Sequence, residues 1–279
     1  MTNPAWSTPL EFDRVIVTGG GSGIGRATAL ELARCGVTVY VLGRRESALQ
    51  GTVEKAKGLS GRIVPISCDL RFPDQVDAAF AKIEADGGPA YGLVHAAAQP
   101  TYQVAEKITL DDMESTIASS LITGFNTLQR WAAPILEANK TQVKKPGSAV
   151  MISSAIAARG GPGIAHSSAA KAGLESFSRA AAKEWAARGV RINIVGPGVF
   201  PVEKSEELWA DPEMAKAVLD SVPMDRFGQL PEIVAPIMYF LTLGAGFTTG
   251  QTIVADGGYG LVPWGIKPEL LARGLNNKY

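Results

Sequence analysis

The stretch Thr18-Gly19-Gly20-Gly21-Ser22-Gly23-Ile24-Gly25 decides the fold of this chain. Residues 14–17 before it, Arg-Val-Ile-Val, form a short β-branched run that is typical of a buried strand. In residues 26–33 after it, apolar side chains recur at helical spacing. The sequence therefore predicts a strand that passes through a glycine turn into a helix.

A turn of this kind is suited to binding a dinucleotide. The first N–H groups of a helix lack backbone partners and carry partial positive charge, and glycines let a pyrophosphate approach the backbone closely. The glycines Gly19, Gly23 and Gly25 give the spacing G-x-x-x-G-x-G, which differs from the commoner G-x-G-x-x-G. An ordinary flexible loop is the alternative interpretation, and the flanking strand and helix argue against it.

The rest of the chain alternates between strand and helix patterns. Further strands are predicted at residues 37–42, 62–66, 91–95, 147–154, 190–195 and 251–255. Helices are predicted at residues 73–85, 109–139 (one or two helices), 164–187 and 231–243. We expect an α/β fold in which residues 1–279 form a single domain: a doubly wound, parallel, seven-stranded, Rossmann-like sheet with helices on both faces.

Composition narrows the possible partners. The 279 residues contain 27 Lys and Arg against 27 Asp and Glu, so neither a nucleic acid nor a membrane surface is an expected partner. The two cysteines, Cys35 and Cys68, lack neighbouring metal-ligand residues; we expect both to be buried in a reducing compartment, and no metal site. With no signal-peptide pattern in residues 1–12 and no bilayer-length apolar run, the expectation is a soluble cytoplasmic protein.

The glycine spacing and the preceding Thr18 resemble the short-chain dehydrogenase/reductase family, and the resemblance extends over residues 14–259. It implies a nicotinamide cofactor, a small helical lid at about residues 200–223 and a homotetramer. The subunits of such a tetramer would pack through the helices expected in residues 109–139 and 164–187. Residues 260–279 form a C-terminal extension to the family pattern.

The end of the second predicted strand indicates which cofactor is used. An acidic residue at this place binds the ribose 2′-hydroxyl of NAD, whereas an arginine accommodates the 2′-phosphate of NADP. The chain has Arg44 and Arg45 here and no acidic residue, which favours NADP(H), although two solvated surface arginines are the alternative. Asp69, by its position, would contact the adenine or else serve as a cap or turn residue. The other cofactor-binding residues that the resemblance implies are Gly19, Gly21, Ser22, Gly23, Ile24, Gly25, Leu70, Ala96, Ala97, Lys171, Pro197 and Gly198.

The family's catalytic signature is altered in this chain. The signature is a strand-end Ser, a Tyr thirteen residues later and a Lys four residues after the Tyr. Counting from Ser154 reaches Ser167 and then Lys171, so Ser and Lys are in register and a serine replaces the tyrosine. The resemblance makes these three the candidate catalytic residues; retention of Lys171 for cofactor binding alone is the alternative. A serine hydroxyl is a far weaker acid than a phenol, whose pKa is near 10, so Ser167 is a poor proton donor.

Other positions also depart from the family pattern. His95, Ala96 and Ala98 stand at a corner that is usually Asn-Asn-Ala-Gly, and we expect His95 to be structural. Ser120, to within one residue, stands where an active-site Asn is usual, and Val202 replaces a Thr.

One branch of the family, which resembles 2,4-dienoyl-CoA reductases, also lacks the tyrosine. Residues 68–71, 166–173 and 182–185 look like that branch. Reduction of a conjugated C=C bond leaves an enolate, which Ser154 and Lys171 can stabilise without a strong acid. Two of the branch's own residues are absent, because Ile156 stands at its tyrosine position and Ser120 at its aspartate position.

Three functions therefore stay open. The first is NADPH-dependent reduction of an enoyl or dienoyl thioester, with a small-molecule substrate such as an acyl-CoA. The second is a carbonyl or alcohol oxidoreductase with a non-standard proton donor, for which His166, Tyr102, Tyr259 and the C-terminal Tyr279 are candidates. His166 precedes Ser167 and so points about 100° away from it; we expect it on the helix surface or at an interface. The third is a non-catalytic NADP(H)-binding protein.

Overall fold

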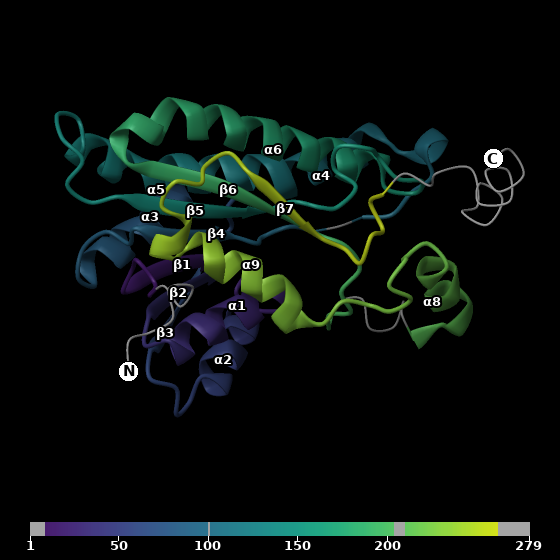
Figure 1. The fold of residues 1–279 in the computed structure, drawn as a ribbon, viewed down its shortest axis with the longest axis horizontal. Coiled ribbons are helices and arrows are strands. Elements are labelled where there is room, and N and C mark those ends of the chain that lie inside the picture. Colours follow the sequence, from purple (N-terminus) through teal and green to yellow (C-terminus); the bar gives the residue numbers. More distant parts are fainter. Residues whose placement is uncertain (1–8, 100, 204–209, 262–279) are drawn as a thin grey trace, which may run out of the picture.

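The computed structural model describes residues 9–99, 101–203 and 210–261. Seven strands form one parallel sheet in the order β3-β2-β1-β4-β5-β6-β7 (Figure 1). The strands are β1 (Arg14–Thr18), β2 (Thr38–Gly43), β3 (Arg62–Ser67), β4 (Gly92–His95), β5 (Gly147–Ile152), β6 (Val190–Pro197) and β7 (Thr252–Ala255). The doubly wound, seven-stranded prediction is confirmed.

Helices cover both faces of this sheet (Figure 1). The first face carries α1 (Gly23–Arg34), α2 (Glu46–Lys55) and α9 (Leu230–Phe240). The second face carries α3 (Pro73–Ala85), α4 (Leu110–Ile117), α5 (Thr123–Ala138) and α6 (Ala165–Trp185). The remaining helical segments of the described residues are η1 (Ala105–Lys107), the π-helical turn η2 (Ala118–Ile122), η3 (Ala186–Arg188), α8 (Pro212–Leu219) and η4 (Leu243–Ala245).

The alternation of side chains along each strand builds two cores. In β1, Val15 and Val17 pack with α1 and α9, while Ile16 packs with α3 and α5. All three are at most 1% exposed. Because both faces of a parallel sheet are covered, its strands are apolar along nearly their whole length, which explains why the strand predictions succeeded.

The strand order reverses at one place in the sheet. Strand β1 pairs with β2 on one side and with β4 on the other, and Thr18 lies opposite His95. In open α/β sheets, ligands bind beyond the carboxyl ends of the strands at such a point. The glycine turn leaves β1 at this end, and Ser153 and Ser154 follow β5 at the same end.

Some details differ from the expectations. Cys68 is buried as expected, but Cys35 is exposed, because it follows the last residue of α1 where the helix opens to solvent. Of the expected lid, residues 200–203 and 210–223 are described and include α8, whereas residues 204–209 lie outside the described residues. The extension is described only as far as Leu261.

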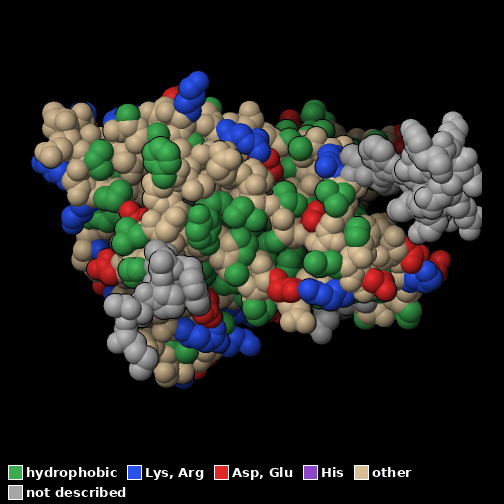
Figure 2. Space-filling view, viewed as in Figure 1, with side chains coloured by type: hydrophobic (Ala, Val, Ile, Leu, Met, Phe, Trp, Pro, Cys, Tyr) green, Lys and Arg blue, Asp and Glu red, His purple; other side chains and the backbone are tan. Residues whose placement is uncertain are grey.

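Two surface properties concern possible partners. None of the helices in the described ranges is long and apolar enough to cross a membrane. Hydrophobic side chains lie on the surface over β7 and α9 (Figure 2). The exposed apolar residues of this part of the chain are Tyr239, Leu243, Phe247 and Val254.

Candidate active site

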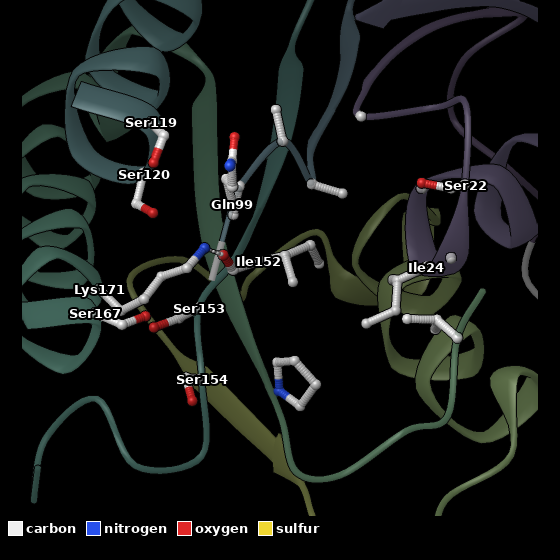
Figure 3. A pocket seen from close by; sticks show the side chains of 18 of the residues that line it. Ser22, Ile24, Gln99, Ser119, Ser120, Ile152, Ser153, Ser154, Ser167 and Lys171 are labelled. Carbon is white, nitrogen blue, oxygen red and sulfur yellow. Dashed lines mark hydrogen bonds between the residues drawn. The ribbon is translucent and has the colours of Figure 1, made fainter. Parts of the chain in front are cut away.

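A cleft of about 1180 Å³ opens at the carboxyl ends of the strands. The glycine turn with Ser22 and Ile24 forms one wall of the cleft, and Ser154, Ser167 and Lys171 lie across from it (Figure 3). The residues predicted for the site that line this single cleft are Gly19, Gly21, Ser22, Gly23, Ile24, Gly25, Arg44, Arg45, Asp69, Leu70, Ala96, Ala97, Ser154, Ser167, Lys171, Pro197 and Gly198. The fold thus brings together all of the predicted cofactor-binding residues and the three candidate catalytic residues.

The glycine turn has the shape and polarity of an anion-binding turn. Gly19 and Gly23 have φ angles of +66° and +53°, which side-chain-bearing residues rarely adopt. A Cβ atom on Gly25 would lie 2.5 Å from the carbonyl oxygen of Gly19, so only glycine lets α1 start so close to the turn. The N–H of Gly23 donates to the carboxylate Oε2 of Glu203 at 2.9 Å. This anion at the first N–H of α1 indicates that the turn fits a pyrophosphate.

Thr18 and His95 join the glycine turn to the neighbouring strand. The Thr18 hydroxyl accepts the N–H groups of Ala96 and Ala97, each at 3.1 Å, so its own proton is directed to Nδ1 of His95 at 3.0 Å. The Nε2 atom of His95 lies 3.5 Å from the hydroxyl of Thr123 at the start of α5. Complete burial, and to a lesser extent the nearby Lys171, lowers the pKa of His95 to about 3, so the ring is neutral. His95 is therefore structural, as the sequence predicted.

Positive charge gathers at the carboxyl ends of β2 and β3. Arg44 and Arg45 are exposed and line the cleft, and Arg44 donates to Gln99 at 2.9 Å. Asp69 binds the side chain and the N–H of Arg71, and the bond to the Arg71 side chain lowers the pKa of that carboxyl. Asp69 thus makes the contacts of a turn residue while it lines the cleft.

The Ser-Lys pair is built from β5 and α6. Ser154 follows the end of β5, and Ser167 and Lys171 lie one turn apart on α6. The Nζ atom of Lys171 donates to the carbonyl of Ile152 at 2.7 Å (Figure 3). Burial lowers the pKa of Lys171 to about 8, so the ammonium form predominates at neutral pH.

The turn η2 interrupts the helical segment between α4 and α5. It places Ser119 and Ser120, together with Thr123, at the cleft (Figure 3). π-helical turns of this kind occur often at functional sites. Ser120 was predicted to stand at the usual asparagine position, and the cleft here is lined by hydroxyls instead of an amide.

The structure places some candidate proton donors in the cleft and one outside it. His166 is fully buried, and its Nε2 atom lies 2.6 Å from the hydroxyl of Thr101. The expectation of a surface or interface histidine is therefore wrong, and His166 does not line the cleft, because α6 turns that side chain under the loop that carries Thr101. Tyr102 and Tyr259 do line the cleft, and Tyr279 lies outside the described residues. Partial desolvation raises the pKa of the Tyr102 phenol, although the residue is 62% exposed.

Sequence reasoning missed several cleft residues and contacts. Among them are Gln99, the cleft position of Arg71, and the contact of Glu203 with the turn. Arg71 could have been predicted, because it is in the stretch that resembles the dienoyl-CoA reductase branch. No local sequence pattern indicates Gln99 or Glu203, because their partners are 55 and 180 residues away in the chain.

A glycine turn at the switch point of a doubly wound sheet, facing a serine and a lysine, defines a dinucleotide-binding oxidoreductase fold. Residues 19–260 match a family model described as enoyl-(acyl carrier protein) reductase. The chain belongs to the short-chain dehydrogenase/reductase family. Members of this family use a nicotinamide cofactor.

The names of the proteins that are similar to this chain describe different reactions. An L-xylulose reductase from Caenorhabditis elegans is 31% identical over 90% of this chain and 98% of its own. A Bacillus subtilis protein named "probable 2,4-dienoyl-CoA reductase" is 31% identical over 91% of this chain and 99% of its own. The solved structure of a variant of actinorhodin polyketide ketoreductase with NADPH superimposes with a TM-score of 0.80, at 25% identity, over 90% of this chain and 98% of its own.

Proposed function

We propose that this protein is an NADPH-dependent reductase of a conjugated C=C bond in an enoyl or dienoyl thioester. The observation that carries the proposal is the serine at position 167, next to a retained Ser154 and Lys171 in one cleft. A reaction that needs a strong proton donor is poorly served by this set, whereas a reaction that needs oxyanion stabilisation is well served.

The cofactor is proposed to lie along the glycine turn, with its 2′-phosphate near Arg44 and Arg45. The anion already bound at the N–H of Gly23 and the absence of an acidic residue at the end of β2 support this choice. Bound NADPH supplies a hydride to the substrate. Lys171 is proposed to bind the nicotinamide ribose as well, as the family resemblance implies.

The chain's own residues then have distinct roles. The Ser154 hydroxyl donates a hydrogen bond to the thioester oxygen, on which negative charge develops. The Lys171 ammonium lies in a buried setting, where its charge acts more strongly than it would in water. The carbon that must be protonated can take its proton from water, so no side chain needs to be a strong acid.

A second candidate function is carbonyl reduction with Tyr102 or Tyr259 as the proton donor. Its support is that both phenols line the cleft. The xylulose reductase and the ketoreductase among the similar proteins are named for reactions at carbonyl groups. A binding protein without activity is the third possibility, motivated by the changes at Ala96, Ser120, Ser167 and Val202.

One assay separates the three functions. NADPH oxidation is followed with 2,4-dienoyl-CoA, 2-enoyl-CoA and simple ketones, and NADPH binding is measured in parallel by fluorescence. Turnover of the thioesters alone, lost in Ser154→Ala and Lys171→Ala, supports the proposal. Turnover of ketones alone supports the second function, and binding without any turnover supports the third.

We also propose that the protein is a cytoplasmic homotetramer. The exposed Phe125 of α5 and the partly buried Phe177 of α6, whose rings meet edge to face, support one subunit contact. The exposed apolar residues over β7 and α9 support a second (Figure 2). Sedimentation of the full chain tests the assembly, and a monomer would contradict it.

A further inference from the structure

Helix α6 carries a buried carboxylate one turn beyond Lys171. Glu175 is 4% exposed, and it is not among the residues that line the cleft. A buried carboxylate is costly unless it is paired and hydrogen-bonded. Its Oε1 atom accepts the hydroxyl of Ser153 at 2.6 Å, and its Oε2 atom accepts Arg179 at 2.6 Å.

The contact with Ser153 forms half of a clamp on the end of β5. The other half is the bond from Lys171 to the carbonyl of Ile152. Two successive residues of the strand end are thereby held by two side chains of α6, one turn apart. The Ser153 hydroxyl donates its proton to Glu175, so Ser154 is the serine of this pair whose hydroxyl can donate to a substrate in the cleft.

The charge of Glu175 also acts on Lys171, because the two residues are 4% and 7% exposed and lie four positions apart on α6, where helical side chains are neighbours. Burial lowers the pKa of Lys171 to about 8, and the carboxylate of Glu175 opposes that shift. The other titratable groups around Lys171 add little favourable charge. On β4, His95 is neutral, and the phenols of Tyr102 and Tyr259 lie along the cleft. Arg179, whose side chain is 47% exposed, partly offsets the carboxylate.

We propose that Glu175 is a positioning residue of the active site, which holds Ser153 at the end of β5 and places a carboxylate one helical turn from the Lys171 ammonium on the same buried face of α6. This role rests on the proposed function for its use in the reaction, but the effect on Lys171 exists without any ligand. It is therefore measurable independently.

The test follows the protonation of Lys171 by NMR in protein labelled at the lysine ε-carbon, with the signal assigned from Lys171→Arg. In the wild type we expect a titration midpoint near pH 8. In Glu175→Gln the midpoint is expected to fall by about one pH unit. Glu175→Asp, which keeps the charge, restores most of the shift. Glu184→Gln, an exposed residue on the same helix, leaves the midpoint unchanged.

Ser153→Ala separates orientation from charge. This variant keeps the carboxylate, so the Lys171 midpoint is expected to stay, while NADPH affinity and turnover decrease. An unchanged midpoint in folded Glu175→Gln overturns the proposal, since a merely structural carboxylate would change stability alone. Wild-type protein that binds no NADPH overturns the proposed function instead, and the titration still tests Glu175.

Discussion

The carboxylate of Glu203 accepts the backbone N–H of Gly23 at 2.9 Å and also pairs with Arg26. Gly23 is the first residue of α1, where a dinucleotide's pyrophosphate would be bound. The protein's own carboxylate and the cofactor therefore compete for the same N–H. Glu203 lies far from this turn in the sequence, just after the Pro197-Gly198 turn that borders the cleft.

Removal of the Glu203 charge is expected to strengthen cofactor binding. In Glu203→Gln, NADPH loses an anionic competitor at the N-terminus of α1, and its affinity should rise about two- to fivefold. Fluorescence titration at low and high salt measures the change, which should shrink as salt screens it. Glu213→Gln on α8 is the matched control. Weaker binding in Glu203→Gln would show that the carboxylate supports the cofactor instead.

Arg44 and Arg45 are expected to select NADPH over NADH. Replacing both by alanine removes charge-assisted hydrogen bonds to the 2′-phosphate and should weaken NADPH binding at least about tenfold. NADH binding should change little, because NADH lacks that phosphate. An equal loss for both cofactors would contradict a role in reading the 2′-phosphate. Arg226→Ala, whose side chain pairs with Glu232 away from the glycine turn, is the control.

A phenol at position 167 is expected to add carbonyl chemistry. Ser167→Tyr places an acid one helical turn before Lys171, and ketone reduction should rise at least about tenfold. Ser167→Phe fills the same space without a hydroxyl and should give no gain. If both variants behave alike, the added bulk and not the proton donor decides the outcome. Steady-state kinetics on ketones and dienoyl-CoA measures both effects.

His95 is expected to make the fold sensitive to acid. Burial lowers the pKa of His95 from 6.5 in the unfolded chain to about 3 in the native protein, so between these pH values the unfolded chain binds a proton that the native protein does not bind. The contribution of His95 to the free energy of unfolding is therefore fully present above pH 6.5 and is lost as the pH falls toward 3. Between pH 6.5 and about 5 the loss is about 2 kcal/mol.

His95→Asn should remove most of this dependence. The amide oxygen can still accept the Thr18 hydroxyl, but the side chain does not titrate. Urea unfolding of wild type and variant at the two pH values gives the comparison. Identical losses of stability in both proteins would show that the acid sensitivity arises elsewhere.

Much of the fold was predictable because its signals are local. Four of the six residues 190–195, namely Val190, Ile192, Ile194 and Val195, are β-branched and apolar, since β6 is covered on both faces. Gly19 and Gly23 are required by the φ angles of their turn. The spacing of Ser154, Ser167 and Lys171 also predicted that these residues lie in one cleft. Ser154 directly follows β5, and Ser167 and Lys171 lie one turn apart on α6, so a fixed spacing in sequence corresponds to a fixed arrangement in space.

Other features depend on contacts that no local pattern encodes. Glu175 is a polar residue on a helix and looks in sequence like any solvated glutamate; its burial follows from Ser153 on another element. The π-helical turn η2 has no residue signature in this chain. The predictions for Cys35 and His166 were wrong for the same reason, since the exposure of a single side chain is decided by elements distant in sequence.

The seam between β1 and β4 has a consequence for the order of folding. Thr18 and His95, whose side chains join the two strands, are 77 residues apart in the chain. Strands β1, β2 and β3 with their helices connect locally, whereas closing the seam costs the entropy of a long loop. We expect residues 14–85, which form β1, β2, β3 and their helices, to assemble first during synthesis and the seam to close late. The cleft straddles this seam, so competence to bind a dinucleotide should arise only as folding is completed.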